Sequence, residues 1–194
     1  MGLSANYLLN LPAVALGRQP TRPLFISYFV THRCFLRCTY CCDGAGTPFP
    51  AQPVPELSTA DAIRLLTLLR AATDTLDIGG GEPLCRDDLE ELLTHCRRIG
   101  LRAVVNTKGI GLEERPDLLR LADAVVLSVD TLDRGRLTAL LGRDEAMADR
   151  ALRNLEFAVR NRIRLGARLV LGAVILPGRV EDAREILRYC VEHG

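Results

Sequence analysis

The hydrophobic positions of this chain follow two alternating patterns. Short apolar runs bounded by turn residues predict buried strands at 24–31, 75–79, 101–107, 124–130 and 167–176. Between these runs, apolar residues recur with helical periodicity. Helices are therefore expected after Ser58, after Asp87, around Leu118, after Asp144 and after Gly178. Strand and helix thus alternate five times along the chain.

This alternation predicts the α/β class, with parallel strands joined by right-handed crossovers. An open doubly wound sheet and a barrel both satisfy the pattern, and periodicity does not distinguish them. The last helix is expected to end near His193, where a further strand would be due. About five β/α units are visible, and we expect either a fragment or an incomplete barrel.

Some helix boundaries and faces can be predicted in more detail. The Ser58 hydroxyl, three residues before Asp61, is typical of a helix start. The helix after Asp144 is expected to present Ile163 on its apolar face. The C-terminal helix is expected to present Leu187 and Val191 in the same way.

Charge narrows the functional classes. The chain has 25 basic and 24 acidic side chains and no run of like charge. It therefore lacks the electrostatic signature of a nucleic-acid-binding protein. Nearly all the bases are arginines, and Lys108 is the only lysine.

The N-terminal apolar stretch does not predict a membrane segment. Residues 7–16 form a short run that contains Pro12 and has no basic residue ahead of it, so it fits neither a signal peptide nor a spanning helix. We expect a cytoplasmic protein that binds no nucleic acid and no membrane. Residues 1–23 are expected to be an N-terminal extension, and 24–194 the domain.

The cysteines carry the strongest chemical signal. There are seven, an odd number, and Cys34, Cys38 and Cys41 lie within eight residues in a loop after the first strand. This C-x3-C-x2-C spacing indicates metal or redox chemistry in a reducing compartment. Three thiolates on a four-iron cluster leave one iron open to an external ligand.

Two other kinds of metal site remain as alternatives. A structural zinc site would need a second pair of cysteines or histidines at suitable spacing, and neither His95 nor the remaining cysteines form one. A four-cysteine electron-transfer cluster would need Cys42, whose direct neighbour Cys41 cannot readily face the same cluster.

A second motif follows the second strand, where Gly80-Gly81-Glu82-Pro83 forms a glycine-rich turn. Together, the cysteine motif with its aromatic Tyr40 and this turn resemble the radical S-adenosylmethionine (SAM) superfamily. The resemblance covers about residues 24–194 and implies a partial (β/α) barrel, incomplete at the C-terminus. It also implies a [4Fe-4S] cluster on the three cysteines, with SAM bound to the open iron and cleaved to a 5′-deoxyadenosyl radical.

The same resemblance suggests residues for SAM binding. Gly80, Gly81 and Glu82 match the turn that bonds the methionyl amine, since glycine lets backbone groups approach a ligand closely. Tyr40 matches an aromatic residue that packs near the adenine. The alternatives are an ordinary strand-to-helix turn for the glycines and a loop anchor for Tyr40.

The fourth strand ends in Ser128-Val129-Asp130, which is similar to a segment of the molybdenum-cofactor-synthesis type and its SPASM-type peptide-modifying relatives. There the serine, and sometimes the acidic residue, contacts the SAM ribose or carboxylate. Helix capping after a strand is the alternative for both residues.

Three further residues have open roles. Arg143 is expected either to pair with the SAM carboxylate or to lie exposed at a helix start. Lys108 stands where relatives often have asparagine, so a contact to a carboxylate competes with a solvated loop cation. Cys85 follows the glycine turn and retains a redox or substrate role as one option.

The resemblance implies a radical SAM enzyme that takes a reductant such as flavodoxin or ferredoxin and acts on a peptide or small biosynthetic precursor. Two alternatives remain. One is a non-enzymatic iron-sulfur protein, either an electron carrier or a cluster-based sensor, and the other is an inactive truncated radical SAM core.

Overall fold

The computed structural model describes residues 5–42, 46–52 and 54–194. Its centre is one sheet of five parallel strands in the order β1-β2-β3-β4-β5. The strands are β1 (Ile26–Thr31), β2 (Thr75–Gly80), β3 (Arg102–Thr107), β4 (Ala124–Ser128) and β5 (Leu169–Gly172). Spatial order therefore follows sequence order, as in the wall of a (β/α) barrel.

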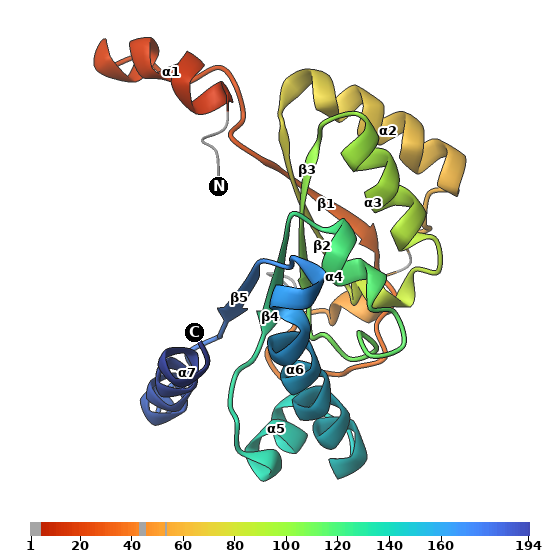
Figure 1. Ribbon diagram of the computed structural model, residues 1–194, viewed down its shortest axis with the longest axis vertical. Coiled ribbons are helices and arrows are strands. Elements are labelled where there is room, and N and C mark those ends of the chain that lie inside the picture. Colours follow the sequence, from red (N-terminus) through yellow and green to blue (C-terminus); the bar gives the residue numbers. More distant parts are fainter. Residues whose placement is uncertain (1–4, 43–45, 53) are drawn as a thin grey trace.

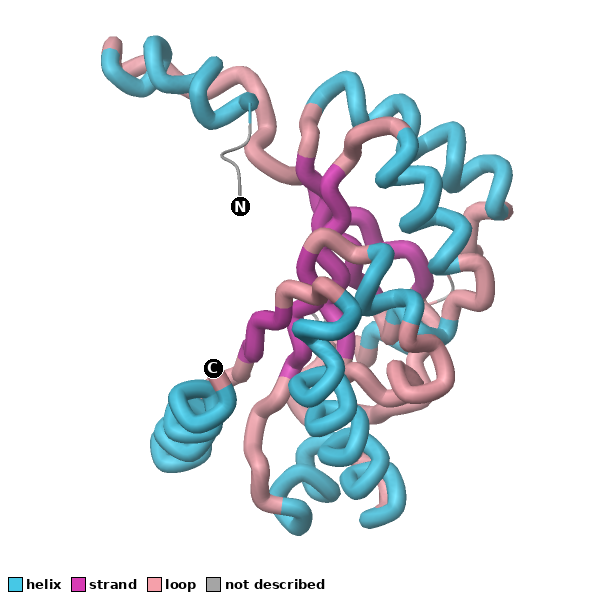
Figure 2. Tube along the Cα trace, viewed as in Figure 1, coloured by secondary structure: helices cyan, strands magenta, loops and turns pink. Residues whose placement is uncertain are grey.

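The crossover helices lie on one face of this sheet (Figure 1). They are α2 (Thr59–Ala72), α3 (Leu89–Arg98), α4 (Asp117–Leu121) and α6 (Glu145–Leu165). The remaining helical elements are α1 (Ala5–Ala15), α5 (Arg134–Leu141), α7 (Val180–His193) and the 3₁₀ turns η1 (Phe49–Ala51) and η2 (Pro83–Cys85). In Figure 2 the opposite face of the sheet opens toward the space between α1 and α7.

Alternate strand residues build the core against these helices. Leu76, Ile78, Val105 and Leu127 point to the helical face and are buried with the apolar side of α2, α3 and α6. Because side chains alternate along a strand, the intervening residues face the other, concave side. The predicted α/β class and partial barrel are confirmed, and the barrel is open because β1 and β5 are the two edges of the described sheet.

The predicted helix start at Ser58 is confirmed, and the helix expected after Asp144 begins with a cap of the same kind. The Ser58 hydroxyl accepts a hydrogen bond from the Asp61 N–H at the start of α2. The Asp144 carboxylate accepts from the Met147 N–H at the start of α6. Both helices therefore begin where a short polar side chain replaces the missing backbone partner.

Some predicted helix faces were wrong. Ile163, Leu187 and Val191 are all exposed, Val191 at 85%. Only one side of α7 packs against the hydrophobic core, where Ile186 is buried. Helical periodicity marks an apolar stripe but does not tell how much of it meets a neighbour.

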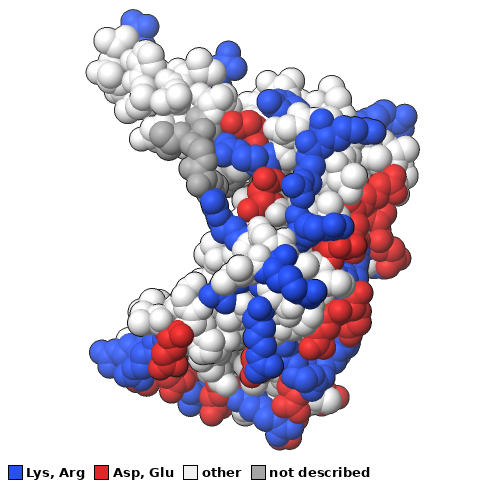
Figure 3. Space-filling model, viewed as in Figure 1, with Lys and Arg blue, Asp and Glu red and all other residues white. Residues whose placement is uncertain are grey.

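Helix α1 was not predicted, and its polar residues face inward. The side chain of Asn6 donates 2.7 Å hydrogen bonds to the carbonyls of Pro23 and Ala72. Asn10 donates to the Arg22 carbonyl at 2.7 Å. The apolar side chains of α1 are consequently exposed, and the surface over α1 is mostly uncharged in Figure 3.

Candidate active site

A cavity of about 410 Å³ lies at the carboxyl ends of the strands, where parallel α/β folds assemble their active sites. It is bounded by the loop after β1, the turn after β2 and the ends of β3, β4 and β5. The predicted site residues that line it are Cys34, Cys38, Tyr40, Cys41, Gly80, Gly81, Glu82, Ser128 and Asp130. Residues separated by up to 96 positions in the sequence thus share one cavity.

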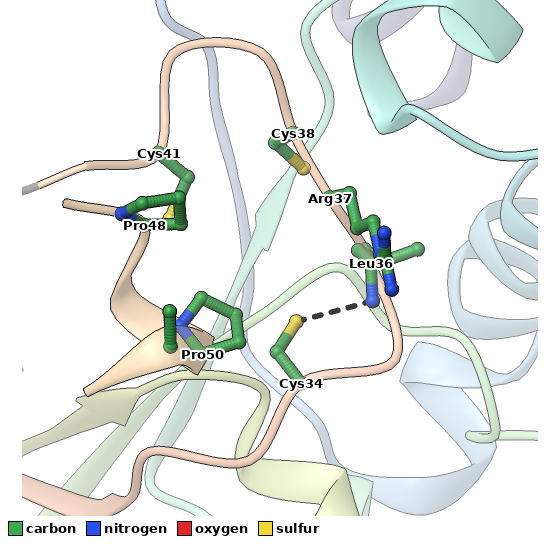
Figure 4. Close-up of a pocket in the computed structure, with 8 residues that line it drawn as sticks. Cys34, Leu36, Arg37, Cys38, Cys41, Pro48 and Pro50 are labelled. Carbon is green, nitrogen blue, oxygen red and sulfur yellow. Dashed lines mark hydrogen bonds between the residues drawn. The ribbon is translucent and has the colours of Figure 1, made fainter. Parts of the chain in front are cut away.

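The loop after β1, residues 32–42 (the cysteine loop), separates this cavity from a second one of about 450 Å³. Cys34, Cys38 and Cys41 line both. Figure 4 shows the three side chains at different points around the second cavity, with Pro48 drawn beside Cys41 and Pro50 on the side toward Cys34. The three cysteines therefore border a space, and Cys34 and Cys38 also pack against a small apolar cluster that includes Leu36 and Leu141.

The glycine turn holds the cysteine loop from one side. The Gly81 N–H donates to the Thr31 carbonyl at 2.8 Å, and the Glu82 N–H donates to the Arg33 carbonyl at 2.9 Å. A Cβ on Gly80 would lie 2.2 Å from the Thr31 oxygen, and one on Gly81 would lie 2.3 Å from the Arg33 oxygen. Only glycine allows this approach, and the backbone N–H groups of Gly81 and Glu82 are both used in it.

Helix α5 holds the loop from the other side. The N–H groups of Arg37 and Thr39 donate to the carbonyls of Leu141 and Leu140 at 3.0 and 3.1 Å. Gly142 ends the helix in a left-handed conformation, and a Cβ there would lie 2.2 Å from the Arg37 oxygen. The carbonyls of Leu140 and Leu141, at the end of α5, therefore fix the loop backbone at Arg37, before Cys38, and at Thr39, after it.

The thiols are protonated in the absence of a metal. Burial raises the pKa of Cys34 to about 12, although the Leu36 N–H, 3.4 Å from the sulfur, opposes this. Burial also raises the pKa of Cys38 and Cys41, while Lys108 lowers both. Metal ions bind thiolates, so binding here would release protons.

The geometry tests the kind of metal that fits. Within residues 5–42, 46–52 and 54–194, no three His, Cys, Asp or Glu side chains converge as a single ion requires. Three thiols spread around a cavity suit a larger iron-sulfur cluster instead. Cys42 is exposed, and its sulfur is near the Tyr40 carbonyl rather than the cavity. The donor set thus fits a cluster with three protein ligands.

The Glu82 side chain forms hydrogen bonds with neighbouring parts of the protein, mostly with backbone N–H groups. Its buried carboxylate accepts from the N–H groups of Leu84 and Lys108, at 3.1 and 2.9 Å, and from the Thr107 hydroxyl. Burial raises the pKa of Glu82, opposed by these hydrogen bonds and by the Lys108 charge. Its side chain therefore joins the ends of β2 and β3, which is a positioning role.

Tyr40, Lys108 and Asp130 form one polar cluster at the edge of the cavity. The Lys108 ammonium pairs with Asp130 and donates to the Tyr40 hydroxyl at 2.9 Å, and that hydroxyl donates to Asp130. The other Asp130 oxygen accepts from the Val174 N–H at 3.0 Å. Burial would raise the pKa of Asp130, but Lys108 and Tyr40 outweigh it, so the pKa lies below its ordinary value. The pKa of Tyr40 is raised, mainly by burial and secondly by the neighbouring Asp130.

The other predicted residues divide between the cavity and its supports. Ser128 ends β4 and lines the cavity. Arg143 instead donates to the Phe35 carbonyl, so it supports the cysteine loop. The Cys85 thiol lies against the Phe35 backbone in the same loop.

Several cavity residues were not singled out from the sequence, and two of them are polar side chains. Asn106 and Thr107, at the end of β3, line it beside Lys108. For Asn106 the signal was available in the strand pattern, because a polar residue at a concave-facing position of a buried strand has no packing purpose. Alternation turns Thr107 to the other side, where it is buried and donates to Glu82.

Comparison with known proteins gives the family. The model of the radical SAM superfamily matches residues 28–190. GTP 3′,8-cyclase of Rhodococcus opacus is 33% identical over 173 residues, which covers 85% of this chain and 47% of that protein. GTP 3′,8-cyclase of Corynebacterium glutamicum is 31% identical over 179 residues, covering 85% and 45%. The chain thus spans about half the length of the curated relatives it matches.

Solved structures share the fold. Streptococcus suis SuiB bound to its precursor peptide SuiA superposes with a TM-score of 0.73 at 20% identity, over 97% of this chain and 41% of SuiB. SuiB bound to S-adenosylmethionine gives 0.71 with the same identity and coverage.

None of the helices in the described residues has both the length and the apolar character needed to cross a bilayer.

Proposed function

Because the chain belongs to the radical SAM superfamily, we propose that it is an enzyme that holds a [4Fe-4S] cluster on Cys34, Cys38 and Cys41 and cleaves SAM. When bound, the cluster supplies the electron for reductive cleavage to methionine and the 5′-deoxyadenosyl radical, which abstracts hydrogen from a substrate. The observation that carries the proposal is the single cavity shared by the three thiols, the glycine turn and Ser128.

The site residues predicted from the sequence each have a part in this proposal. The carbonyls of Gly80 and Gly81 accept from the methionyl amine, because the N–H groups of Gly81 and Glu82 already bond the cysteine loop. The Ser128 hydroxyl bonds the ribose or carboxylate, and the Tyr40 ring packs near the adenine. Glu82 and Asp130 act through the residues they position.

The partners follow from the chemistry. The cluster requires a one-electron reductant such as flavodoxin or ferredoxin, and the free thiols of the described residues suit the reducing cytoplasm. The substrate is a peptide or a small biosynthetic precursor. The first class is supported by the likeness of the fold to SuiB, and the second by similarity to GTP 3′,8-cyclase.

Anaerobic reconstitution tests the proposal. The full chain is loaded with iron and sulfide, reduced with dithionite and given SAM, and 5′-deoxyadenosine is measured by chromatography. We expect 5′-deoxyadenosine from the wild type and from Cys42→Ala, whose side chain is exposed, and none from Cys38→Ala. A stoichiometric cluster without 5′-deoxyadenosine would instead indicate an electron carrier, a sensor or an inactive core.

A further inference from the structure

A row of polar side chains crosses three neighbouring strands of the sheet. The Ser27 hydroxyl on β1 donates to Asp77 Oδ2 on β2 at 2.9 Å, and the Asn106 amide on β3 donates to Asp77 Oδ1. Ser27 and Asp77 are directly paired in the strand register. These side-chain bonds do not involve the cysteine loop. They are also not required to pair the strands, because backbone groups make the hydrogen bonds of the sheet.

This row lies on the concave face. Leu76 and Ile78 are buried against the helices, so Asp77 between them points the other way, and Gly79 occupies the next concave-facing position of the strand. Gly79 and Asn106 both line the 410 Å³ cavity. The row therefore continues the wall of the cavity along the concave face, away from the cysteine loop.

Hydrogen-bonding capacity determines what the row can receive. Asp77 uses one lone pair of each carboxylate oxygen for Ser27 and Asn106, which leaves further acceptor sites on both oxygens. The Asn106 side-chain oxygen is also an acceptor. The Ser27 hydroxyl and one of the two N–H groups of Asn106 are turned toward Asp77, which leaves the row one amide donor beside several acceptors and a negative charge.

The charges around the row point to the same preference. Among the described residues that line the cavity, Lys108 is the only base, and it is paired with Asp130. Arg102, on the concave side of β3, donates to Asp74 at 2.9 Å and to Thr75 at 3.0 Å. A polyphosphate needs lysine or arginine donors, and both Lys108 and Arg102 are already engaged with carboxylates.

We propose that Ser27, Asp77 and Asn106 form a substrate-recognition subsite that binds a cationic amino group, which favours an amine-bearing peptide over a nucleoside triphosphate. The inference rests on the proposed function, because it assigns a substrate class to the same cavity. Asp77 supplies the charge, while Ser27 and Asn106 hold its carboxylate in a fixed orientation.

Binding measurements test the subsite without turnover. The probes are the tripeptide acetyl-Ala-Lys-Ala-amide, its norleucine counterpart without the charge, and GTP, each titrated calorimetrically into the reconstituted full chain. We expect the lysine peptide to bind at least about tenfold more tightly than the norleucine peptide, a difference worth ~1.4 kcal/mol, and GTP to show no saturable binding.

Two variants assign the preference to Asp77. Asp77→Asn keeps the shape of the side chain and is expected to remove the preference for the lysine peptide. Asp117→Asn, on an exposed carboxylate of α4, is the matched control and should retain it. Equal binding of the two peptides, a preference that survives Asp77→Asn, or saturable GTP binding would each overturn the subsite.

The two proposals fail separately. If 5′-deoxyadenosine forms but the peptides bind alike, the subsite is wrong and the enzyme function stands. If the lysine peptide is preferred but SAM is not cleaved, the subsite stands and the enzyme function is wrong.

Discussion

The ammonium of Lys108 pairs with the carboxylate of Asp130, and the two charges are held across the ends of β3 and β4. The Lys108 side chain is 12% exposed and that of Asp130 only 1%, so water screens the pair little. Both groups also form hydrogen bonds with the hydroxyl of Tyr40, the residue before Cys41 in the sequence. The pair therefore connects the sheet to the cysteine loop.

Removing one partner should cost more than removing both. Lys108→Met leaves Asp130 buried without its cation, and we expect a loss of about 3 kcal/mol in the free energy of unfolding. Adding Asp130→Asn should recover part of this loss, because the uncompensated charge disappears. Urea unfolding of the apo protein, followed by circular dichroism, measures both. The matched control is Arg120→Met in the exposed pair with Asp117, expected to change stability by less than about 0.5 kcal/mol.

The same pair predicts how stability depends on pH. The pKa of Asp130 is lower in the folded state than in the unfolded chain, so its charged form stabilises the fold. This contribution is present above the unfolded pKa of about 4 and is lost as the pH falls through the lower folded value. Wild type should therefore lose stability relative to Asp130→Asn on acidification below about pH 4, measured by thermal unfolding at several pH values. If the stabilities of the two proteins changed with pH in the same way over that range, the lowered pKa assigned to Asp130 would be wrong.

Much of the fold could be predicted because its signals are local. Each strand is a short apolar run, and each of the Ser58 and Asp144 caps acts within three residues. The cysteine motif and the glycine turn are likewise contiguous in the sequence. Their shared position at one edge of the sheet then follows from the parallel topology.

The rest could not be predicted, because it depends on contacts between distant residues. Tyr40 and Asp130 are 90 positions apart, and Arg143 and Phe35 are 108 apart. Spacing alone cannot tell that Arg143 supports the cysteine loop rather than a ligand. Helix α5 was missed for a related reason. Its sequence, Arg134–Leu141, contains Gly135 and lacks a clear apolar stripe, so tertiary contacts decide its conformation.

Glu82 should be sensitive to a change that keeps its size. In Glu82→Gln, one carboxylate oxygen becomes an NH₂ group that must face a donor, since Leu84, Thr107 and Lys108 all donate to this side chain. Leaving a buried donor unpaired costs about 1–3 kcal/mol, and we expect a loss of that size on chemical unfolding. The control is Glu91→Gln on the exposed side of α3, which should have no measurable effect. If Glu82→Gln left the free energy of unfolding unchanged, the Glu82 carboxylate would not be a positioning group.

Gly81 tests the contact between the glycine turn and the cysteine loop. In Gly81→Ala the new Cβ would lie 2.3 Å from the Arg33 oxygen, so the loop must move. We expect lower stability of the apo protein together with less iron bound on reconstitution, measured by unfolding and by iron analysis. Gly135→Ala in α5 is the control, because its Cβ would be 3.5 Å from the nearest atom and alanine favours a helix. Full iron content in Gly81→Ala would show that the close approach does not position the cysteines.

The protonation of Cys34 gives a prediction that needs no cofactor. Its pKa is raised to about 12 by burial, so at neutral pH almost all of it is the thiol, which does not react with alkylating agents. In the apo protein, iodoacetamide should modify Cys34 far more slowly than the exposed Cys42, as measured by peptide mapping and mass spectrometry. The rate at Cys34 should keep rising with pH well beyond the pKa of a free cysteine, about 8.5. The pH range must stop short of unfolding, which circular dichroism monitors in parallel. Rapid modification of Cys34 at neutral pH would mean that the thiol is not desolvated, and that the loop does not hold it in the position described.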